Sequence, residues 1–580
     1  MAKQADLVIR GGTVFDGAGG EPFVADVAVV GGRISAVGPN LPAGREEIDA
    51  TGLAVTPGFI DVHTHYDGQL VWSTQLSPSS GHGVTTVVTG NCGVGFAPCR
   101  PRDHTRLIKL LEGVEDMPEV VLADGLTWDW ETFPEFVEAL KRRRHDIDFA
   151  LQLPHSAVRM YVMGERAVDR GVATQADMDE MRRIAREAVE AGAFGFGTSC
   201  NIFHTTLAGD VIPTAHTPEA ELKAIAQGMV DAGGGVIQAI LNLQQPVEDL
   251  EMFRRVAAQT GCPLSFTLLQ VGGPDPGNWK TLLESVAQGN AEGHLVTGQV
   301  FARPLGVMLG LDASFHPFTA FPSYQAIAHL PLAEQVVQMR KPEVRAAILS
   351  EQPDHGAIVF SRVARLFDTI FPLGEKPDYE PDPSTSVAAV AAARGLTPDE
   401  AVYDLLLEDD GHALLLQTAA NYVDRNLDAV HEMLTHPNTV PALGDGGAHY
   451  GTICDSTYTT FLLTHWGRDR ARGRIPTAEL IRLMTTKPAA MLGLRDRGRI
   501  APGLKADLNV IDLGALTLRA PRMVRDLPSG GRRLTQDAEG YRATVVSGQV
   551  IQRDGRPTGA LPGRMVERSA RAAPMALAAE

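Results

Sequence analysis

The stretch PGFIDVHTHYD, residues 57–67, decides how this chain is interpreted, because an apolar strand-like run ends in two histidines one residue apart. Side chains two positions apart on an extended chain point to the same face, so His63 and His65 can reach one metal ion together. An isolated pair of this kind can also be two polar residues that close a half-buried strand. The PGFID run before the pair and Asp67 behind it favour a metal site.

Two segments, one directly before this stretch and one near the end of the chain, have the same sequence pattern. Residues 5–54 form short apolar runs separated by glycine pairs, as hairpins require, and residues 498–548 repeat that pattern. Two strand clusters at opposite ends predict one small β domain, formed by residues 1–55 together with residues 490–555.

Between these clusters, apolar strands alternate with amphipathic helices, as in ADMDEMRRIAREAVEAG followed by AFGFGTS. This alternation predicts an α/β fold with a parallel sheet, either a (β/α)8 TIM-like barrel or a doubly wound sheet, over residues 56–489. Loops after the strands then carry the chemistry. A more helical, less regular stretch at about 274–434 indicates an insertion, and residues 556–580 are expected to form a mobile or partner-clasping tail.

Two further strand ends carry candidate metal ligands. In GHGVTTVVTGNCG an apolar strand runs into Cys92, whose thiolate can bind a metal, although most lone cysteines are small buried hydrophobic residues. In VPALGDGGAHYG, Asp445 follows a short strand and can bind a metal and accept a proton, although Asp-Gly is also a common turn. His449, four residues later, is a further ligand candidate or a substrate contact.

These motifs, together with the closing RGRIAPGLKADLNVID, resemble the amidohydrolase superfamily, and within it the D-aminoacylase or N-acyl-D-amino-acid deacylase branch. The GNCG element separates this branch from relatives that use a carboxylated lysine to bridge two metals. The resemblance implies a TIM-like barrel and a composite β-sandwich from both termini. It also implies zinc bound by four residues, namely His63, His65, Cys92 and Asp445.

The sequence departs from this branch at two mid-barrel strands, which read GGGVIQAILN and CPLSFTLLQ and contain no histidine. The resemblance places metal-binding histidines there, and Gln238 and Leu268 stand near those positions. Glutamine binds zinc poorly compared with imidazole, so one zinc ion is favoured over two. His204 or His216 could supply a replacement ligand, although both lie well past the nearest strand.

Several polar residues in expected strand-end loops are candidates for substrate binding, and each is equally compatible with a structural role. Arg159 could bind a substrate carboxylate through two parallel hydrogen bonds. The full set is His155, Arg159, His204, Ser323, Tyr324 and His449.

The predicted activity is metal-dependent hydrolysis of a C–N amide bond in an N-acyl (D-)amino acid or related amide. Asp445 serves as general base toward water activated at the metal and then as general acid toward the leaving nitrogen. One alternative is a hydrolase of cyclic amides, lactones or esters that uses the same residues. The other is a non-catalytic binding or assembly relative, which the missing mid-barrel histidines would suit.

Composition restricts the partners. A net charge of −18 argues against nucleic acid, because phosphate binding depends on clustered Lys and Arg. No stretch reaches the roughly 18 consecutive apolar residues of a membrane span, and the N-terminus lacks the pattern of a secretory signal. Five scattered cysteines form no disulfide framework. We therefore expect a cytoplasmic enzyme with a small-molecule amide substrate and no membrane partner, and the resemblance leaves homo-oligomer formation open.

Overall fold

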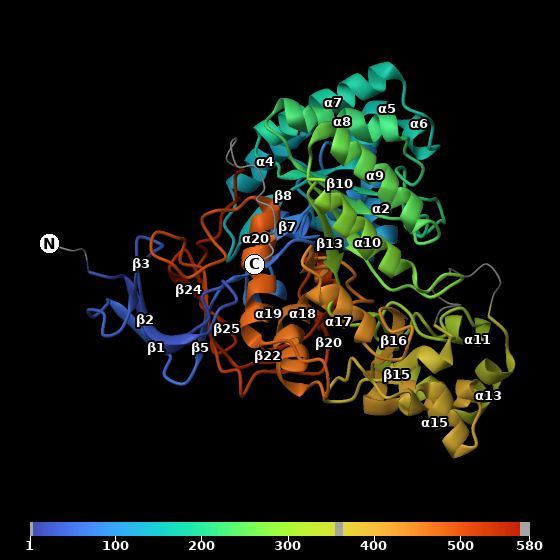
Figure 1. The fold of residues 1–580 in the computed structure, drawn as a ribbon. Coiled ribbons are helices and arrows are strands. Elements are labelled where there is room, and N and C mark those ends of the chain that lie inside the picture. Colours follow the sequence, from blue (N-terminus) through green and yellow to red (C-terminus); the bar gives the residue numbers. More distant parts are fainter. Residues whose placement is uncertain (1–3, 354–363, 569–580) are drawn as a thin grey trace.

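The two ends of the chain meet in one nine-stranded sheet. The computed structural model describes residues 4–353 and 364–568. In Figure 1 this sheet lies at the left, where blue strands from the N-terminal part stand beside red strands from the C-terminal part. The N-terminal strands are β1 (Leu7–Val14), β2 (Phe23–Val30), β3 (Arg33–Gly38), β4 (Glu46–Asp49) and β5 (Ala54–Pro57). The C-terminal strands are β18 (Leu508–Ile511), β23 (Tyr541–Val546), β24 (Gln549–Arg553) and β25 (Arg556–Pro557).

The junction between the two ends is the antiparallel pair β5–β18, in which Pro57 lies opposite Leu508 and Val55 opposite Val510. Alternate residues of these strands face a common apolar core with Leu7 and Val27. Burial of that face holds the two distant segments together, since apolar area removed from water is the main stabilising contribution in folding. The sheet leads directly into the strand that precedes His63 and His65.

The middle of the chain forms two parallel sheets. One contains β6 (Phe59–Asp61), β7 (Val84–Thr89) and β8 (Asp148–Leu151). The other contains β9 (Leu153–Pro154), β10 (Gly195–Ser199), β11 (Val236–Ile240), β12 (Leu264–Leu268), β13 (Val296–Val300) and β17 (Thr439–Pro441). The two sheets adjoin at both sides. Strand β9 follows β8 after a single residue. On the other side, where the chain continues past β6 and β17, the amide of Asp445 donates to the carbonyl of His63 at 3.2 Å. This is the mixed α/β arrangement of a TIM-barrel-like fold, as predicted.

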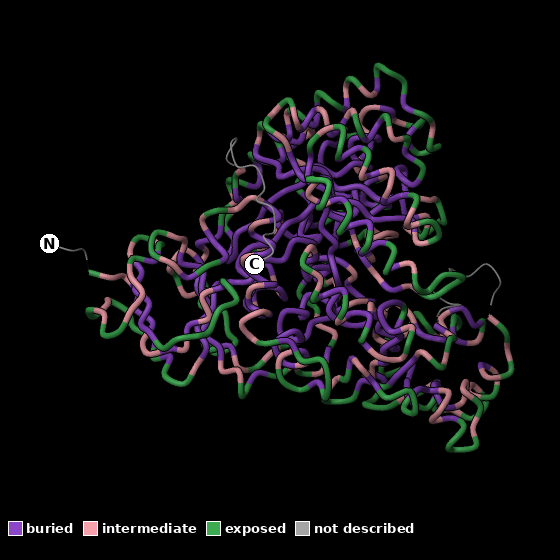
Figure 2. Tube along the Cα trace, viewed as in Figure 1, coloured by how far each residue is buried: buried purple, intermediate pink, exposed green. Residues whose placement is uncertain are grey.

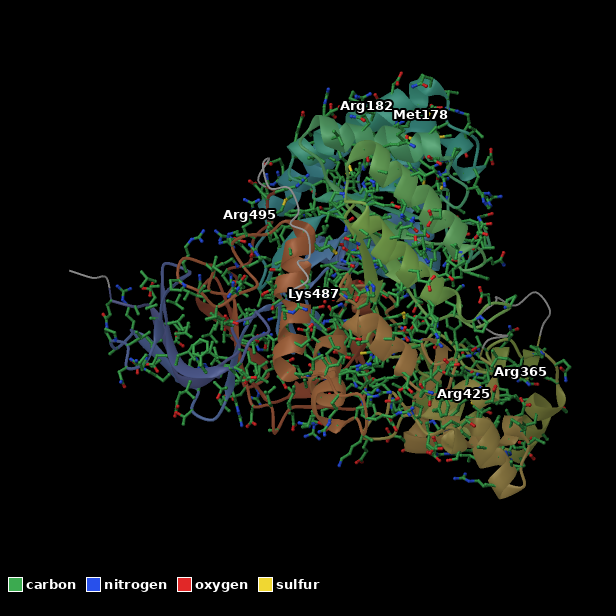
Figure 3. All side chains as sticks on the ribbon, viewed as in Figure 1. Met178, Arg182, Arg365, Arg425, Lys487 and Arg495 are labelled. Atoms are coloured by element: carbon green, nitrogen blue, oxygen red, sulfur yellow. The ribbon has the colours of Figure 1, made fainter. Side chains whose placement is uncertain are left out.

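Amphipathic helices pack around the parallel strands. In Figure 1 the green helices α7 (Gln175–Glu190), α8 (Glu219–Asp231), α9 (Pro246–Thr260) and α10 (Asn278–Ala291) stand outside them. Helix α7 begins with a capping box, in which the Thr174 hydroxyl accepts from the Asp177 amide and stabilises the first turn. Arg182 of α7, labelled in Figure 3, pairs with Asp231 of α8 at 2.7 Å on the outer surface. The side of the helices toward the strands is buried, as Figure 2 shows in purple.

The irregular segment starts later than the sequence pattern indicated. Residues 274–300 continue the regular alternation, because α10 leads into β13, which pairs in parallel with both β12 and β17. The irregular part begins at β14 (Leu305–Leu309), which forms an antiparallel sheet with β15 (Ile370–Pro372) and β16 (Leu415–Ala420). It has its own apolar core, to which Phe318 and Tyr403 belong.

The expected C-terminal tail is only partly a tail. Residues 556–557 form β25, and the amide of Val566 donates to the carbonyl of Phe149 at 2.7 Å, so this part packs along β8. Residues 569–580 lie outside the described part of the chain. Within the described ranges, every helix is too short or too polar to cross a membrane.

Candidate metal centre

Three strand ends bring the predicted ligands to one edge of the parallel sheets. His63 and His65 follow β6, and Cys92 follows β7. The Cys92 sulfur lies 3.3 Å from Nε2 of His63 and 3.6 Å from Nε2 of His65. These three ligand atoms lie within 4.8 Å of one another, and all three residues are buried. Such spacing matches donors that share one ion with bond lengths of about 2.0–2.3 Å.

Asp445, which follows β17, completes the arrangement. Its Oδ1 lies 3.6 Å from Nε2 of His63 and 3.7 Å from Nε2 of His65. That oxygen is buried and has no hydrogen-bond partner. A buried polar atom without a partner is costly, so an unpaired carboxylate oxygen aimed at two imidazoles indicates that a cation belongs between them.

The side chains of two buried glutamines form hydrogen bonds with His63 and with the backbone of Cys92. Nδ1 of His63 lies 2.7 Å from Oε1 of Gln299, and the Gln299 amide donates to Ser265 at 2.9 Å. This contact requires a proton on Nδ1, which leaves the lone pair of Nε2 free for a metal. Gln238 accepts a hydrogen bond from the Cys92 backbone amide at 3.1 Å, so it positions the cysteine turn. Leu268 is fully buried and apolar.

Three residues of the site have left-handed backbone conformations, with φ of 55° at Cys92, 45° at Asp445 and 52° at His449. Such φ values cost roughly 1–3 kcal/mol for residues other than glycine, and they concentrate at functional sites. The loop after β17 also requires Gly447, whose φ is 90° and where a Cβ would lie 2.8 Å from the carbonyl oxygen of His65. Close approach of this loop to the histidine strand brings Asp445 to the cluster.

Burial controls the protonation of the ligands. Burial lowers the pKa of His63 to about 4, against which Gln299 acts weakly, and it also lowers the pKa of His65. Both imidazoles are therefore neutral at physiological pH, as metal binding requires. Burial raises the pKa of the Cys92 thiol and of the Asp445 carboxyl, with neighbouring carboxylates adding to the effect. Without a cation the thiol and the carboxyl therefore favour their protonated forms, whereas a bound cation favours the thiolate and the carboxylate. The two neutral imidazoles, the thiol and the unpaired oxygen thus fit a divalent ion such as zinc.

Glu115 joins the site from a direction that the sequence did not indicate. It is the last residue of α2 (His104–Glu115) and is 1% exposed. Its Oε2 lies 3.5 Å from Nε2 of His65 and 3.3 Å from Nε2 of His449, while its Oε1 has no partner. Burial raises the pKa of the Glu115 carboxyl, and the charges of Asp445 and Asp67 add to this. No local signal identifies this residue, because a glutamate at a helix end normally faces solvent.

A cavity of about 300 Å³ opens beside the four ligands. Glu115, His204 and His449 contribute to its wall, and Nδ1 of His204 lies 3.0 Å from the Ser199 hydroxyl. Much of the remaining wall is aliphatic, including Leu241, Leu243, Leu269, Leu282, Leu305, Val307, Leu443 and Ile453.

Comparison with known proteins assigns the chain to a family. The model of an amidohydrolase family matches residues 46–552, which is most of the chain. The chain belongs to the amidohydrolase family. This amidohydrolase is 27% identical to an N-acyl-D-aspartate deacylase and 26% identical to a D-aminoacylase, both from Alcaligenes xylosoxydans xylosoxydans. Each alignment covers 97% of this chain, with 95% and 98% of the respective relative.

The fold of this amidohydrolase also matches a solved N-acyl-D-glutamate deacylase from Bordetella bronchiseptica, in complex with zinc and a phosphonate inhibitor that mimics the tetrahedral intermediate. The TM-score is 0.65 at 24% identity, over 98% of this chain and 100% of the other. The family match and the two curated relatives confirm the predicted resemblance to the D-aminoacylase and deacylase branch and the prediction of an enzyme of the amidohydrolase type.

Four of the residues expected to bind substrate lie elsewhere in this amidohydrolase. His155 and Arg159 both contact Glu221, at 2.9 and 2.7 Å. In this buried cluster the guanidinium of Arg159 is paired with the Glu221 carboxylate. Ser323 binds the carboxylate of Glu351, and the Tyr324 hydroxyl donates to Gln335 at 3.1 Å, in the irregular segment. None of these four lines the cavity, so the structure does not place them to contact a substrate there.

The remaining two expected contacts, His204 and His449, do line the cavity of this amidohydrolase. His216 is exposed and does not line it. Neither Gln238 nor Leu268 contributes to the cavity wall.

Proposed function

We propose that this amidohydrolase cleaves the C–N amide bond of an N-acyl amino acid or a related amide, at a zinc site formed by His63, His65, Cys92 and Asp445. The observation that carries the proposal is that the Cys92 sulfur and the unpaired Asp445 oxygen each lie within 3.7 Å of the Nε2 atoms of both His63 and His65. The two curated relatives are named as an N-acyl-D-aspartate deacylase and a D-aminoacylase, and zinc accompanies the solved deacylase.

A zinc ion held by these residues would acidify water and polarise the amide carbonyl. The chain itself must then move the proton. Asp445 is placed for this task, because its Oδ1 lies beside both histidines and has no other partner. Asp445 accepts the proton of the attacking water and delivers it to the leaving nitrogen, so that the C–N bond breaks to give a carboxylic acid and an amine.

The donor set supports one ion rather than two. The two mid-barrel positions that would hold a second ion in the resembling branch carry Gln238, which is engaged with the Cys92 amide, and Leu268, which is buried. Gln299 fixes the tautomer of His63 and is therefore a positioning residue.

Finer features of the chain are proposed on the same basis. We interpret the two parallel sheets as one (β/α)8 barrel, and the nine-stranded sheet as part of a β-sandwich formed by residues 1–55 and 490–555. The five cysteines are all free thiols, which supports a reducing, cytoplasmic setting.

Metal analysis of the purified protein tests the proposal. We expect about one zinc per chain, lost in His63→Ala and in Cys92→Ala. Cys262→Ala is the matched control, because Cys262 is a buried thiol remote from the ligands and should leave the zinc content unchanged. A stable protein that binds no divalent metal, or a zinc-loaded protein that cleaves no amide in a broad panel, would exclude this function.

A further inference from the structure

The cavity beside the metal ligands carries little positive charge of its own. Among the described residues, neither arginine nor lysine lines it. Apart from the metal-site residues and His204, its polar side chains are the neutral Asn201, Thr267 and Asn278. The entrance is apolar as well, since Phe203 lines the cavity and is 46% exposed.

The buried arginines nearest in the chain to these strand ends are already engaged. Arg159, which follows β9, pairs with Glu221 at 2.7 Å, and Arg303, which follows β13, pairs with Asp455 at 3.1 Å. Both side chains are almost completely buried, so neither can turn into the cavity without leaving a carboxylate unpaired.

A carboxylate on the substrate would therefore find no fixed cationic partner in the described wall. Burial of an unpaired charge in an apolar site is strongly unfavourable. The acidic groups of the site, Glu115 and Asp445, likewise offer no positive charge to a substrate carboxylate. The carboxyl group produced by hydrolysis is different, because it forms next to the metal ligands themselves.

We propose that the substrate is a neutral amide, with apolar groups on both sides of the scissile bond and no free carboxylate on the amine portion. This inference rests on the proposed hydrolytic function and narrows its substrate class to the related amides that lack the carboxylate of an N-acyl amino acid. It separates the chain from an enzyme specific for N-acyl aspartate or N-acyl glutamate, whose substrates carry two carboxylates.

A matched pair of substrates tests the inference on the zinc-loaded enzyme. N-Octanoyl-D-leucine and N-octanoyl-3-methylbutylamine differ only in the carboxylate of the amine portion. We expect kcat/KM for the neutral amide to exceed that for the acid by at least about tenfold. Equal or faster cleavage of the acid, or faster cleavage of N-octanoyl-D-glutamate, would overturn the inference. Cleavage of neither compound, nor of any amide in the panel, would instead contradict the proposed function.

Two cavity variants provide a second test. Leu305→Arg and Val271→Lys each introduce a cation at a half-buried position of the wall. The ratio of kcat/KM for the acid to that for the neutral amide should rise by at least about tenfold in either variant. Leu305→Gln is the neutral control and should leave the ratio unchanged, and zinc content verifies that each variant keeps its site. An unchanged ratio in both folded cationic variants would show that this wall does not contact the amine portion, and would overturn the inference.

Discussion

Oε2 of Glu115 lies 3.5 Å from Nε2 of His65, which links the end of α2 directly to the histidine pair after β6. The same oxygen lies 3.3 Å from Nε2 of His449 in the loop after β17. Glu115 thus connects three segments of the chain at the metal centre. A buried carboxylate in this position can add negative charge where a cation is expected.

Substitution of this carboxylate should weaken metal binding. In Glu115→Gln we expect the zinc affinity to fall by about 10- to 100-fold, because the charge is lost while the size of the side chain is kept. Competition with a chromogenic chelator measures the affinity. Glu112→Gln, one turn earlier on the same helix, should bind zinc as the wild type does. Wild-type affinity in Glu115→Gln would show that the carboxylate has no part in holding the ion.

Removal of the Gln299 side-chain oxygen that binds Nδ1 of His63 should also weaken zinc binding, because the imidazole is then held less firmly. Gln299→Leu leaves the Nδ1 proton of His63 without its 2.7 Å partner, and zinc affinity should fall by roughly 10- to 100-fold. Gln299→Glu retains an acceptor and should keep most of the affinity. Equal affinity in the leucine variant and the wild type would mean that packing alone orients His63.

The proton-transfer role of Asp445 predicts a separation of binding from turnover. Asp445→Asn should lower kcat by about 10²- to 10⁴-fold while a larger share of the zinc remains bound, since the amide oxygen can still face the ion but cannot accept a proton. Parallel measurement of kcat and zinc content makes the comparison. Turnover equal to that of the wild type would remove Asp445 from the proton-transfer step.

The stability of the protein should decrease in mild acid because of a histidine remote from the metal ligands. His82 is buried between the Thr460 hydroxyl and the carbonyl of Gln536, each at 2.8 Å, and burial lowers its pKa to about 4. The unfolded chain, with a pKa near 6.5, binds this proton more readily, so the contribution is present above pH 6.5 and is lost as the pH falls toward 4.

The matched variant His82→Gln lacks this titration. Between pH 7 and pH 5 the free energy of unfolding of the wild type should fall by roughly 2 kcal/mol more than that of the variant. Urea unfolding midpoints at several pH values give the comparison. Parallel pH profiles for the two proteins would show that His82 remains neutral in both states over this range.

The four metal ligands can be predicted from the sequence, whereas the contacts of the residues around them cannot. The strand ends at His63, His65, Cys92 and Asp445 could be predicted because each belongs to a short local pattern, an apolar run followed by a polar residue. Arg159 was assigned incorrectly, because its buried partner Glu221 lies in another helix and leaves no mark on the residues around Arg159.

The sequence by itself determined the pair His63 and His65, the cysteine that completes the cluster and the family to which they belong. Spacing along one extended segment sets which side chains share a face, and that spacing is written in the chain. Only the tertiary structure placed Glu115 beside His65, turned Gln238 toward the Cys92 amide and brought Leu305 of the irregular segment to the cavity wall. These contacts join segments far apart in sequence, and they arise from packing of the whole chain rather than from any local pattern.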